Sequence, residues 1–517
     1  MGIIVNTSLG KVEGVQESNY QSFLGVRYAK PLVNELRFCA PLPIEAWDGV
    51  YDASRFGQSA PQYDGGQGAI KDTSEDCLYL NVFTPKADDA KRPVMVWIHG
   101  GGFVFGSAGM GYGKGYGKKI VPRGNIVLVT INYRLGVFGF FNWPGLTKNN
   151  GLRDQVCALE WVRDNIRYFG GDHNNVTIFG QSSGGRAVTS LLAMPSAKGL
   201  FHKAIPQSGT AHPYAYDDTP SKKASEDLFE VLGIKTGDID SLREVDWTEI
   251  NKAQHEIFGK LNPKEHRILF PFRPIIDDAT IPVLPLDAIR NGFAKDIPLL
   301  IGNTVDERKV YNRGLIRANQ IEIIHKRHQK MDEGSLLRFT NKYMKFYGKS
   351  EKDAKTLIET YKKARKGKLP IEPYEIAYTI NTDEAYRIPV IRIAEAQCQN
   401  QQNTYCYLFG FESPLYKDLL GACHTIDLPF IFGTYDHPNP NTEVMVGRDN
   451  LEELETFSNL IMDTWISFAK NGDPNHPGLP KWPKYELNNR ATMILTPDPE
   501  IVNAPMDEER IAWESIL

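Results

Sequence analysis

Short, continuously apolar segments alternate with stretches of helical periodicity along most of the chain. The candidate strands are Leu78–Phe83, Val94–Ile98, Ile126–Tyr133, Val176–Phe179, Lys203–Gln207, Pro298–Ile301, Thr404–Leu408 and Met493–Leu495. Helical patterns fall between them, notably at Leu152–Phe169 and Gly185–Met194. Strands that are apolar on both faces and separated by helices are typical of a parallel sheet covered on both sides. The pattern therefore predicts an α/β fold with a large, mostly parallel central sheet flanked by helices.

Two further patterns refine this organisation. The N-terminal residues alternate as a strand hairpin that turns at Ser8, Leu9 and Gly10, which predicts a small N-terminal β-sheet. Longer and more polar helical stretches, at about 221–258 and 310–385, are interpreted as insertions above the carboxyl ends of the strands. Because no Pro-, Ser- or Gly-rich linker interrupts the sequence, residues 1–517 are expected to form a single domain.

Composition restricts the class of protein. The 517 residues are 41% hydrophobic, enough for a sizeable core, and the formal net charge of −4 argues against a nucleic-acid partner. The N-terminus lacks the pattern of a signal peptide, and the longest apolar run is broken by polar residues, so no membrane segment is expected. The six cysteines form no C-x-x-C pair, which favours reduced thiols and a cytoplasmic location.

The most informative motif is Gly-x-Ser-x-Gly around Ser182. It follows the apolar strand pattern at 176–179 and precedes a helical pattern, as in a nucleophile elbow, where a sharp turn presents a serine. Ser183 fits this motif less well, because the residue two positions before it is Gln181 rather than glycine. The pentapeptide alone is weak evidence, so its context decides its value.

A second motif supplies that context. His99 and three following glycines come after the apolar strand at 94–98, and His-Gly-Gly-Gly provides an oxyanion hole in esterases and lipases with such elbows. The glycine-rich segment 106–117 does not have the spacing of a phosphate-binding loop. It is interpreted as a rim of the active site, with Phe105, Tyr112 and Tyr116 available to line the entrance. No metal-binding spacing is found, and no cofactor is expected.

The chain resembles the type-B carboxylesterase family of cholinesterase-like α/β-hydrolases, and within it the bacterial para-nitrobenzyl esterase group. Besides the two motifs above, the resemblance is carried by the segments Phe23–Pro31, Leu36–Phe38, Ser74–Val82, Asn132–Gly136, Gly151–Gln155, Phe169–Asp172, Gly199–Phe201, Gln207–Gly209 and Leu428–Gly433. These segments extend over nearly the whole chain. The resemblance implies the α/β-hydrolase fold and hydrolysis of carboxylic esters.

A serine nucleophile needs a histidine base, and the histidine needs a carboxylate to orient it. The resemblance implies His424 as the base. After the strand at 298–301 two carboxylates, Asp306 and Glu307, compete as the acid, and the register of the family selects Glu307. The glycine that usually follows this glutamate is replaced by Arg308. Backbone N–H groups of Gly101, Gly102 and Ser183 are implied as the oxyanion hole.

Other positions are assigned only by the resemblance. Gln181 stands where the family usually has glutamate, which removes a negative charge beside the nucleophile. Ser208 is either a residue that hydrogen-bonds near the acid or a turn serine. Phe105 is expected beside the pocket. The ion pairs of the scaffold are expected to be Arg37 with Glu75 and Arg134 with Asp172.

Two differences from secreted relatives concern the region around residues 60 to 77. Ala60 occupies the position of the expected disulfide partner of Cys77. The loop from Pro61 to Thr73 contains no tryptophan, so the aromatic site for quaternary ammonium is missing and acetylcholine is not expected as a substrate.

These observations predict a monomeric serine carboxylesterase that forms an acyl-enzyme with a small-molecule ester. A catalytically silent interaction domain is one alternative, although relatives of that kind have lost triad residues. An interfacial lipase is the other, and it would require an amphipathic lid that the sequence does not clearly contain.

Overall fold

The computed structural model describes residues 2–62, 72–109, 111–209, 216–260 and 270–517. The chain divides into two compact units: Met1–Leu299 with Trp465–Pro474, and Leu300–Thr464 with Asn475–Leu517. Most of the loop from Pro61 to Thr73, in which the sequence has no tryptophan, lies outside the described residues.

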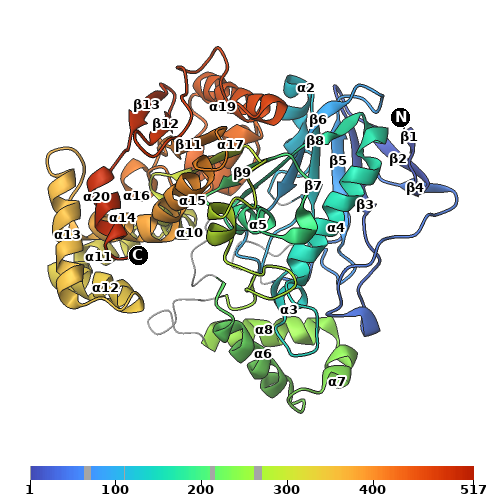
Figure 1. Ribbon diagram of the computed structural model, residues 1–517, viewed down its shortest axis with the longest axis horizontal. Helices are drawn as coiled ribbons and strands as arrows, with labels where there is room; N and C mark the ends of the chain where they lie inside the picture. Colours follow the sequence, from blue (N-terminus) through green and yellow to red (C-terminus); the bar gives the residue numbers. More distant parts are fainter. Residues whose placement is uncertain (1, 63–71, 110, 210–215, 261–269) are drawn as a thin grey trace. The chain divides into compact units, whose positions relative to one another are not determined.

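The strands of the first unit follow the spatial order β1-β2-β3-β5-β7-β6-β8-β9, and Figure 1 shows β5 to β8 side by side. Their bounds are β1 Gly2–Asn6, β2 Lys11–Gln16, β3 Gln21–Arg27, β4 Val50–Asp52, β5 Tyr79–Thr84, β6 Arg92–Ile98, β7 Val127–Ile131, β8 Gly171–Gln181 and β9 Lys203–Gln207. Strand β6 pairs in parallel with β7 and β8, and β8 pairs in parallel with β9, as predicted. Antiparallel pairs join β1 to β2, β2 to β3, β3 to β5 and β5 to β7, so the sheet is mixed.

The expected N-terminal hairpin is present as β1 and β2, with β4 paired in parallel to β2. Strand β2 pairs with β3 at Val15 with Ser22 and Gln16 with Gln21. The central strands are different, because every residue of β7 and β9 is buried. Burial on both faces explains why these strands are continuously apolar in the sequence.

Helices cover the strands of the first unit. Their bounds are α1 Gly115–Lys118, α2 Ile120–Gly124, α3 Gly136–Phe140, α4 Asn150–Asn165, α5 Ser183–Leu191, α6 Thr219–Leu232, α7 Ile239–Glu244, α8 Trp247–Lys260 and α9 Pro285–Arg290. Helix α5 packs against β6, β8 and β9, and α4 packs against β8. Helices α6 to α8 occupy the stretch 221–258 that the sequence marks as helical.

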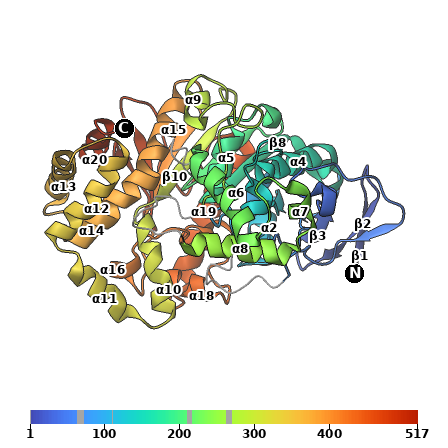
Figure 2. The same cartoon turned by 90° about the horizontal axis from the view of Figure 1, so that it is seen from below.

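In the second unit the strands follow the order β10-β11-β12-β13. Their bounds are β10 Leu299–Thr304, β11 Thr404–Phe409, β12 Ala491–Leu495 and β13 Glu500–Asn503. The longer helices are α10 Tyr311–Arg317, α11 Ile321–Lys330, α12 Glu333–Phe346, α13 Glu351–Arg365, α14 Pro373–Thr382, α15 Ile388–Cys398, α18 Pro440–Val446, α19 Leu451–Asn471, which extends into the first unit, and α20 Asp507–Glu514. Figure 2 shows α12, α13, α14 and α20 grouped together.

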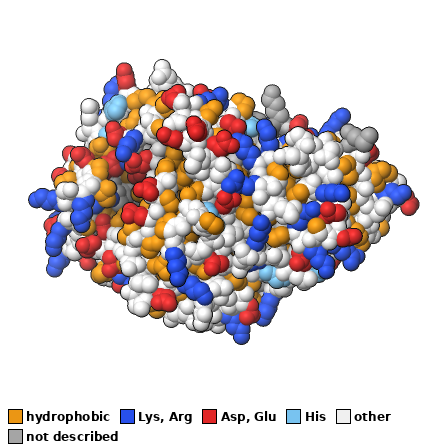
Figure 3. Space-filling view, turned by 90° about the horizontal axis from the view of Figure 1, so that it is seen from above, with side chains coloured by type: hydrophobic (Ala, Val, Ile, Leu, Met, Phe, Trp, Pro, Cys, Tyr) orange, Lys and Arg blue, Asp and Glu red, His pale blue; other side chains and the backbone are white. Residues whose placement is uncertain are grey.

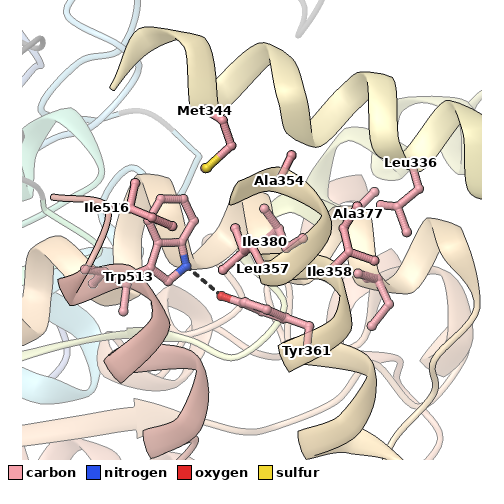
Figure 4. Packing of buried hydrophobic residues seen from close by; sticks show 12 residues of the cluster. Leu336, Met344, Ala354, Leu357, Ile358, Tyr361, Ala377, Ile380, Trp513 and Ile516 are labelled. Atoms are coloured by element: carbon pink, nitrogen blue, oxygen red, sulfur yellow. Dashed lines mark hydrogen bonds between the residues drawn. The ribbon is translucent and has the colours of Figure 1, made fainter. Parts of the chain in front are cut away.

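These four helices share an apolar core, drawn in Figure 4. It includes Leu336 and Met344 of α12, Leu357 of α13 and Trp513 of α20. The indole N–H of Trp513 donates a hydrogen bond of 2.7 Å to the hydroxyl of Tyr361, so the one polar group of this large side chain is satisfied. A core of this kind fixes the expected helical stretch 310–385 against the C-terminal helix.

Of the two predicted ion pairs, one is confirmed and the other is wrong. Arg37 donates to both carboxylate oxygens of Glu75 at 2.6 Å. Arg134 pairs instead with Asp154 of α4, at 2.8 and 2.7 Å. Asp154 is completely buried beside the guanidinium, whereas a carboxylate oxygen of Asp172 accepts from the backbone N–H of Asn174 in the exposed first part of β8.

The expected rim of aromatic residues is also corrected. Tyr112 and Tyr116 are 7% and 3% exposed, and their rings contact each other at 5.4 Å between centroids. Tyr116 packs further against Trp97 of β6 at 6.5 Å. These two tyrosines therefore belong to the core of the first unit rather than to an open entrance.

The surface and the thiols add little constraint on function. All six cysteines are free thiols, including the buried Cys77. On the face drawn in Figure 3 basic and acidic side chains are interspersed. Within the described ranges no helix combines the length and apolar character needed to cross a membrane.

Candidate active site

Ser182 lies at the sharp turn between β8 and α5 in the first unit. Its backbone has φ 61° and ψ −122°, a conformation that is strained for any residue except glycine. The backbone N–H of Ser182 donates to the carbonyl oxygen of Gln207 on β9 at 2.9 Å, which helps to hold the turn. The structure therefore has a sharp strand-to-helix turn at Ser182, where the sequence predicts one.

The glycines of the elbow allow another strand to approach closely. A Cβ atom at Gly184 would lie 2.0 Å from the carbonyl oxygen of Ile98, and one at Gly180 would lie 2.6 Å from the same oxygen. Either side chain would push β6 away from the turn.

The glycine loop after β6 folds onto this elbow. A Cβ at Gly100 would lie 2.6 Å from the carbonyl oxygen of Gln181 and 3.2 Å from the Cβ of Ser182. Gly101 has φ 111°, and a Cβ there would lie 2.0 Å from the carbonyl oxygen of Phe105. The loop with Gly101 and Gly102 thus lies close to Ser182, and Ser183 begins α5, where helical N–H groups favour a developing anion.

The histidine of the glycine motif has a structural role. His99 is 2% exposed, its ring stacks on Tyr133 at 4.4 Å, and its Nδ1–H donates to the carbonyl oxygen of Gly100 at 2.8 Å. Burial lowers the pKa of His99 from 6.5 to about 4. His99 is therefore neutral in the native protein at neutral pH and shapes the loop instead of carrying charge.

Two histidines with lowered pKa values, the buried His99 and the half-buried His328, predict that the fold loses stability in acid. Burial also lowers the pKa of His328, on α11, to about 4. Between pH 6.5 and 4 the unfolded chain binds protons at these sites that the native state does not bind, so stability should fall as the pH falls through this window. We expect the free energy of unfolding in urea to decrease accordingly, and to decrease less steeply in His328→Gln. Equal slopes in the two proteins would contradict the prediction.

In the second unit Glu307 and His424 form a buried pair. Glu307 is fully buried at the start of the short 3-10 helix Glu307–Val310, and His424 is 8% exposed. One carboxylate oxygen, Oε1, accepts from the backbone N–H of Thr304 at 2.9 Å, and the other, Oε2, is hydrogen-bonded to Nδ1 of His424. Because an ionised carboxylate can only accept, Nδ1 must carry the proton, which leaves Nε2 as the basic nitrogen.

The neighbouring Asp306 has other partners. Its Oδ2 accepts from the backbone N–H of Ala422 at 3.1 Å, and its Oδ1 forms an ion pair with Lys309 at 3.2 Å. Gly421 has φ 50°, and a Cβ there would lie 2.2 Å from Oδ2 of Asp306. Asp306 therefore holds the loop that carries His424, while Glu307 contacts the imidazole.

The remaining candidates are all in the first unit. Gln181 is buried at the end of β8, and Phe105 donates its backbone N–H to the carbonyl oxygen of Gly101 at 3.1 Å. Ser208 follows β9 with φ 47°, and its buried hydroxyl has no hydrogen-bond partner among the described residues of that unit. Phe105 and Gln181 thus border the glycine loop and elbow, whereas Glu307 and His424 belong to the second unit.

Two aromatic neighbours were not predicted from the sequence. The ring of Phe270 lies 3.3 Å from the position of a Cβ at Gly102, and it contacts Phe258 edge to face at 5.4 Å between centroids. In the second unit Tyr386 packs against His424. Neither residue lies in a recognisable motif, so only the folded chain reveals them. Among the described residues no three His, Cys, Asp or Glu side chains form a group that could hold a metal.

Comparison of the sequence with known proteins gives matches over almost the full length. A profile described as the carboxylesterase family matches residues 2–513. The para-nitrobenzyl esterase of Bacillus subtilis is 35% identical, over 98% of this chain and 97% of its own. Liver carboxylesterase B-1 of Rattus norvegicus is 32% identical, over 95% of this chain and 90% of its own.

Solved structures of esterases also match this chain over almost its full length. A thermophilic PNB esterase superposes with a TM-score of 0.81 at 34% identity, covering 98% of this chain and 99% of that one. A carboxylesterase of Geobacillus stearothermophilus has a TM-score of 0.84 at 32% identity, with 99% of both chains covered.

Proposed function

Because the chain belongs to the carboxylesterase family and is a carboxylic ester hydrolase, we propose that Ser182, His424 and Glu307 are its catalytic triad. The buried hydrogen bond between Glu307 and His424 is the main support for this assignment, since the adjacent Asp306 bonds to the N–H of Ala422 and to Lys309 instead. The strained turn at Ser182 supports the nucleophile independently.

The proposed reaction begins with attack of Ser182 Oγ on the ester carbonyl carbon. Nε2 of His424 accepts the hydroxyl proton as the C–O bond forms, and Glu307 stabilises the imidazolium through Nδ1. The tetrahedral intermediate then collapses, and the departing alkoxide takes the proton from Nε2. Water attacks the acyl-enzyme with the same base and releases the carboxylic acid and free Ser182.

The N–H groups of Gly101, Gly102 and Ser183 are proposed to bind the negative oxygen of the tetrahedral intermediate. Donors fixed in the backbone need no reorganisation when the charge develops. The close packing of Gly100 against Ser182 supports this role, because it holds the glycine loop beside the nucleophile.

The proposed substrates are esters of short carboxylic acids, dissolved in water rather than presented at a lipid interface. The ring of Phe270 lies 3.3 Å from the position of a Cβ at Gly102, so it would restrict the room for an acyl group whose carbonyl oxygen is bound by the N–H groups of the glycine loop. Neither a cofactor nor a metal is proposed for the reaction.

A series of para-nitrophenyl esters from acetate to palmitate tests this substrate class. We expect kcat/KM to be highest for acyl groups of about two to six carbons, since a crowded pocket penalises each added methylene. Phe270→Ala should shift the optimum toward longer acyl groups. Activity that appears only above the solubility limit of the ester would instead indicate an interfacial lipase.

We propose that residues 1–517 act as one catalytic domain, since the carboxylesterase family profile extends over residues 2–513. We also propose that the enzyme is a cytoplasmic monomer. The free thiols, among them Cys77, support a reducing location.

A further inference from the structure

Tyr386 lies against the imidazole of His424. The centroids of the two rings are 5.1 Å apart and their planes are inclined by 46°. Tyr386 is half-buried and comes from the segment between α14 and α15, far from His424 in the sequence. Aromatic pairs at this separation are attractive beyond the area that they bury.

A ring packed against a histidine base can fix the orientation of its imidazole. The hydrogen bond from Nδ1 to Glu307 fixes one point of the imidazole. A tilt of the ring about that point would change the direction of the lone pair on Nε2. A flat group against the ring restricts the tilt, and proton transfer depends strongly on alignment.

Arg308 also contacts the ring of Tyr386. Its guanidinium carbon lies 5.2 Å from the centroid of the Tyr386 ring, within the range of a cation–π interaction. The backbone N–H of Arg308 donates to Thr382 Oγ1 at 3.3 Å, and its side chain donates to the hydroxyl of Tyr311 at 2.7 Å. Residue 308 directly follows the acid, so the residue that departs from the family pattern contacts the ring beside the base.

The backbone that presents Tyr386 is unusual and firmly held. Residues Asp383–Arg387 form a π-helical turn, a rare geometry that is frequent at functional sites. Asp383 and Arg387 are the first and last residues of this turn. The guanidinium of Arg387 donates buried hydrogen bonds of 2.6 Å to both carboxylate oxygens of Asp383, which joins the two ends. Tyr361 also donates to Asp383, and Trp513 donates to Tyr361, which ties the turn to the core in Figure 4.

We propose that Tyr386 is a positioning residue for His424, and that Arg308 keeps Tyr386 in place. The inference rests on the proposed role of His424 as the base. The proposal explains the arginine at position 308. Arg308 holds the ring of Tyr386, which orients the imidazole of His424, and Arg308 itself is not proposed to contact the reacting atoms.

Substitution of Tyr386 provides the direct test, with hydrolysis of para-nitrophenyl butyrate as the assay. In Tyr386→Leu we expect kcat to fall about 10- to 100-fold with little change in KM, because the base is misaligned while binding is retained. Tyr386→Phe keeps the ring and should restore a turnover near that of the parent. Equal kcat values in Tyr386→Leu and the parent would overturn the proposal.

A matched control exists in the same unit. Tyr374 of α14 stacks on His328 with centroids 4.0 Å apart, so it is also a tyrosine packed on a histidine. Tyr374→Leu removes a similar contact away from the proposed base and should leave kcat unchanged. If both leucine variants lose the same activity, the effect is one of general packing and the proposal fails.

The role of Arg308 is tested by a double-mutant cycle. Arg308→Gly, which installs the usual residue of the family, should lower kcat about threefold to tenfold through release of the Tyr386 ring. In the double variant with Tyr386→Leu the two losses should not add, since both changes remove one arrangement. Additive losses would show that Arg308 acts independently of Tyr386.

The melting temperature of the variants and the activity of His424→Ala distinguish the possible reasons for a lost activity. If Tyr386→Leu has a much lower melting temperature than the parent, Arg308→Gly carries the test, because Arg308 is partly exposed and outside the apolar core. His424→Ala tests the premise. Activity that survives in His424→Ala would refute the proposed triad. Inactivity of His424→Ala together with full activity of Tyr386→Leu would refute only the positioning role.

Discussion

Ser182→Ala is expected to abolish ester hydrolysis, with kcat lower by about 10⁴-fold or more, because the members of a triad act as a unit. The variant should fold and bind ester, since the removed hydroxyl is a single oxygen atom. Turnover of para-nitrophenyl butyrate measures the loss. An organophosphate should label the parent protein on Ser182, as mass spectrometry of the digested protein can verify.

Ser183→Ala is the matched control for this change. Ser183 is proposed to act through its backbone N–H at the start of α5, and alanine retains that group. Most of the activity should therefore remain. A label on Ser183, or appreciable activity in Ser182→Ala, would refute the assignment of the nucleophile.

Glu307→Gln should cause the second large loss, about 10³- to 10⁴-fold in kcat, through the wrong tautomer of His424. The backbone N–H of Thr304 already donates to Oε1 of Glu307. In the amide the single oxygen should keep that partner, which places the NH₂ group toward Nδ1. Nδ1 must then accept a hydrogen bond, and the proton moves to Nε2, where it blocks the base.

Asp306→Asn distinguishes the two neighbouring carboxylates. The asparagine oxygen can still accept from the N–H of Ala422, although the ion pair with Lys309 is lost. We expect a lower melting temperature but activity within about tenfold of the parent, because the imidazole keeps its own partner. A greater loss of kcat in Asp306→Asn than in Glu307→Gln would reverse the assignment of the acid.

The central part of the fold could be predicted because burial imposes a simple pattern. The strand predicted at Lys203–Gln207 agrees with β9 at both ends, and the solved relatives confirm the expected α/β-hydrolase fold. Strand β3 was not predicted, since it begins with the polar pair Gln21 and Ser22, which are nonetheless buried. Strand β13 is short and partly exposed, and such strands leave little signal in a sequence.

Contacts between distant residues were harder to predict than elements. The sequence contains many carboxylates that could pair with Arg134, and only the placement of α4 identifies Asp154 as its partner. Likewise, Asp306 and Glu307 are adjacent and both carry a carboxylate, and the resemblance to a family was needed to choose between them. Tyr386 carries no motif at all, because its position depends on the π-helical turn.

The strained backbone at Ser182 lowers the stability of the fold, although the proposed reaction requires a serine at this position. Holding a non-glycine residue at φ 61° and ψ −122° costs on the order of 1–3 kcal/mol. Glycine would relieve that cost, so selection for heat resistance alone would favour replacement of the nucleophile by the residue that destroys the enzyme. Libraries evolved toward thermostability should therefore be screened for turnover in every round, or position 182 should be excluded from mutagenesis.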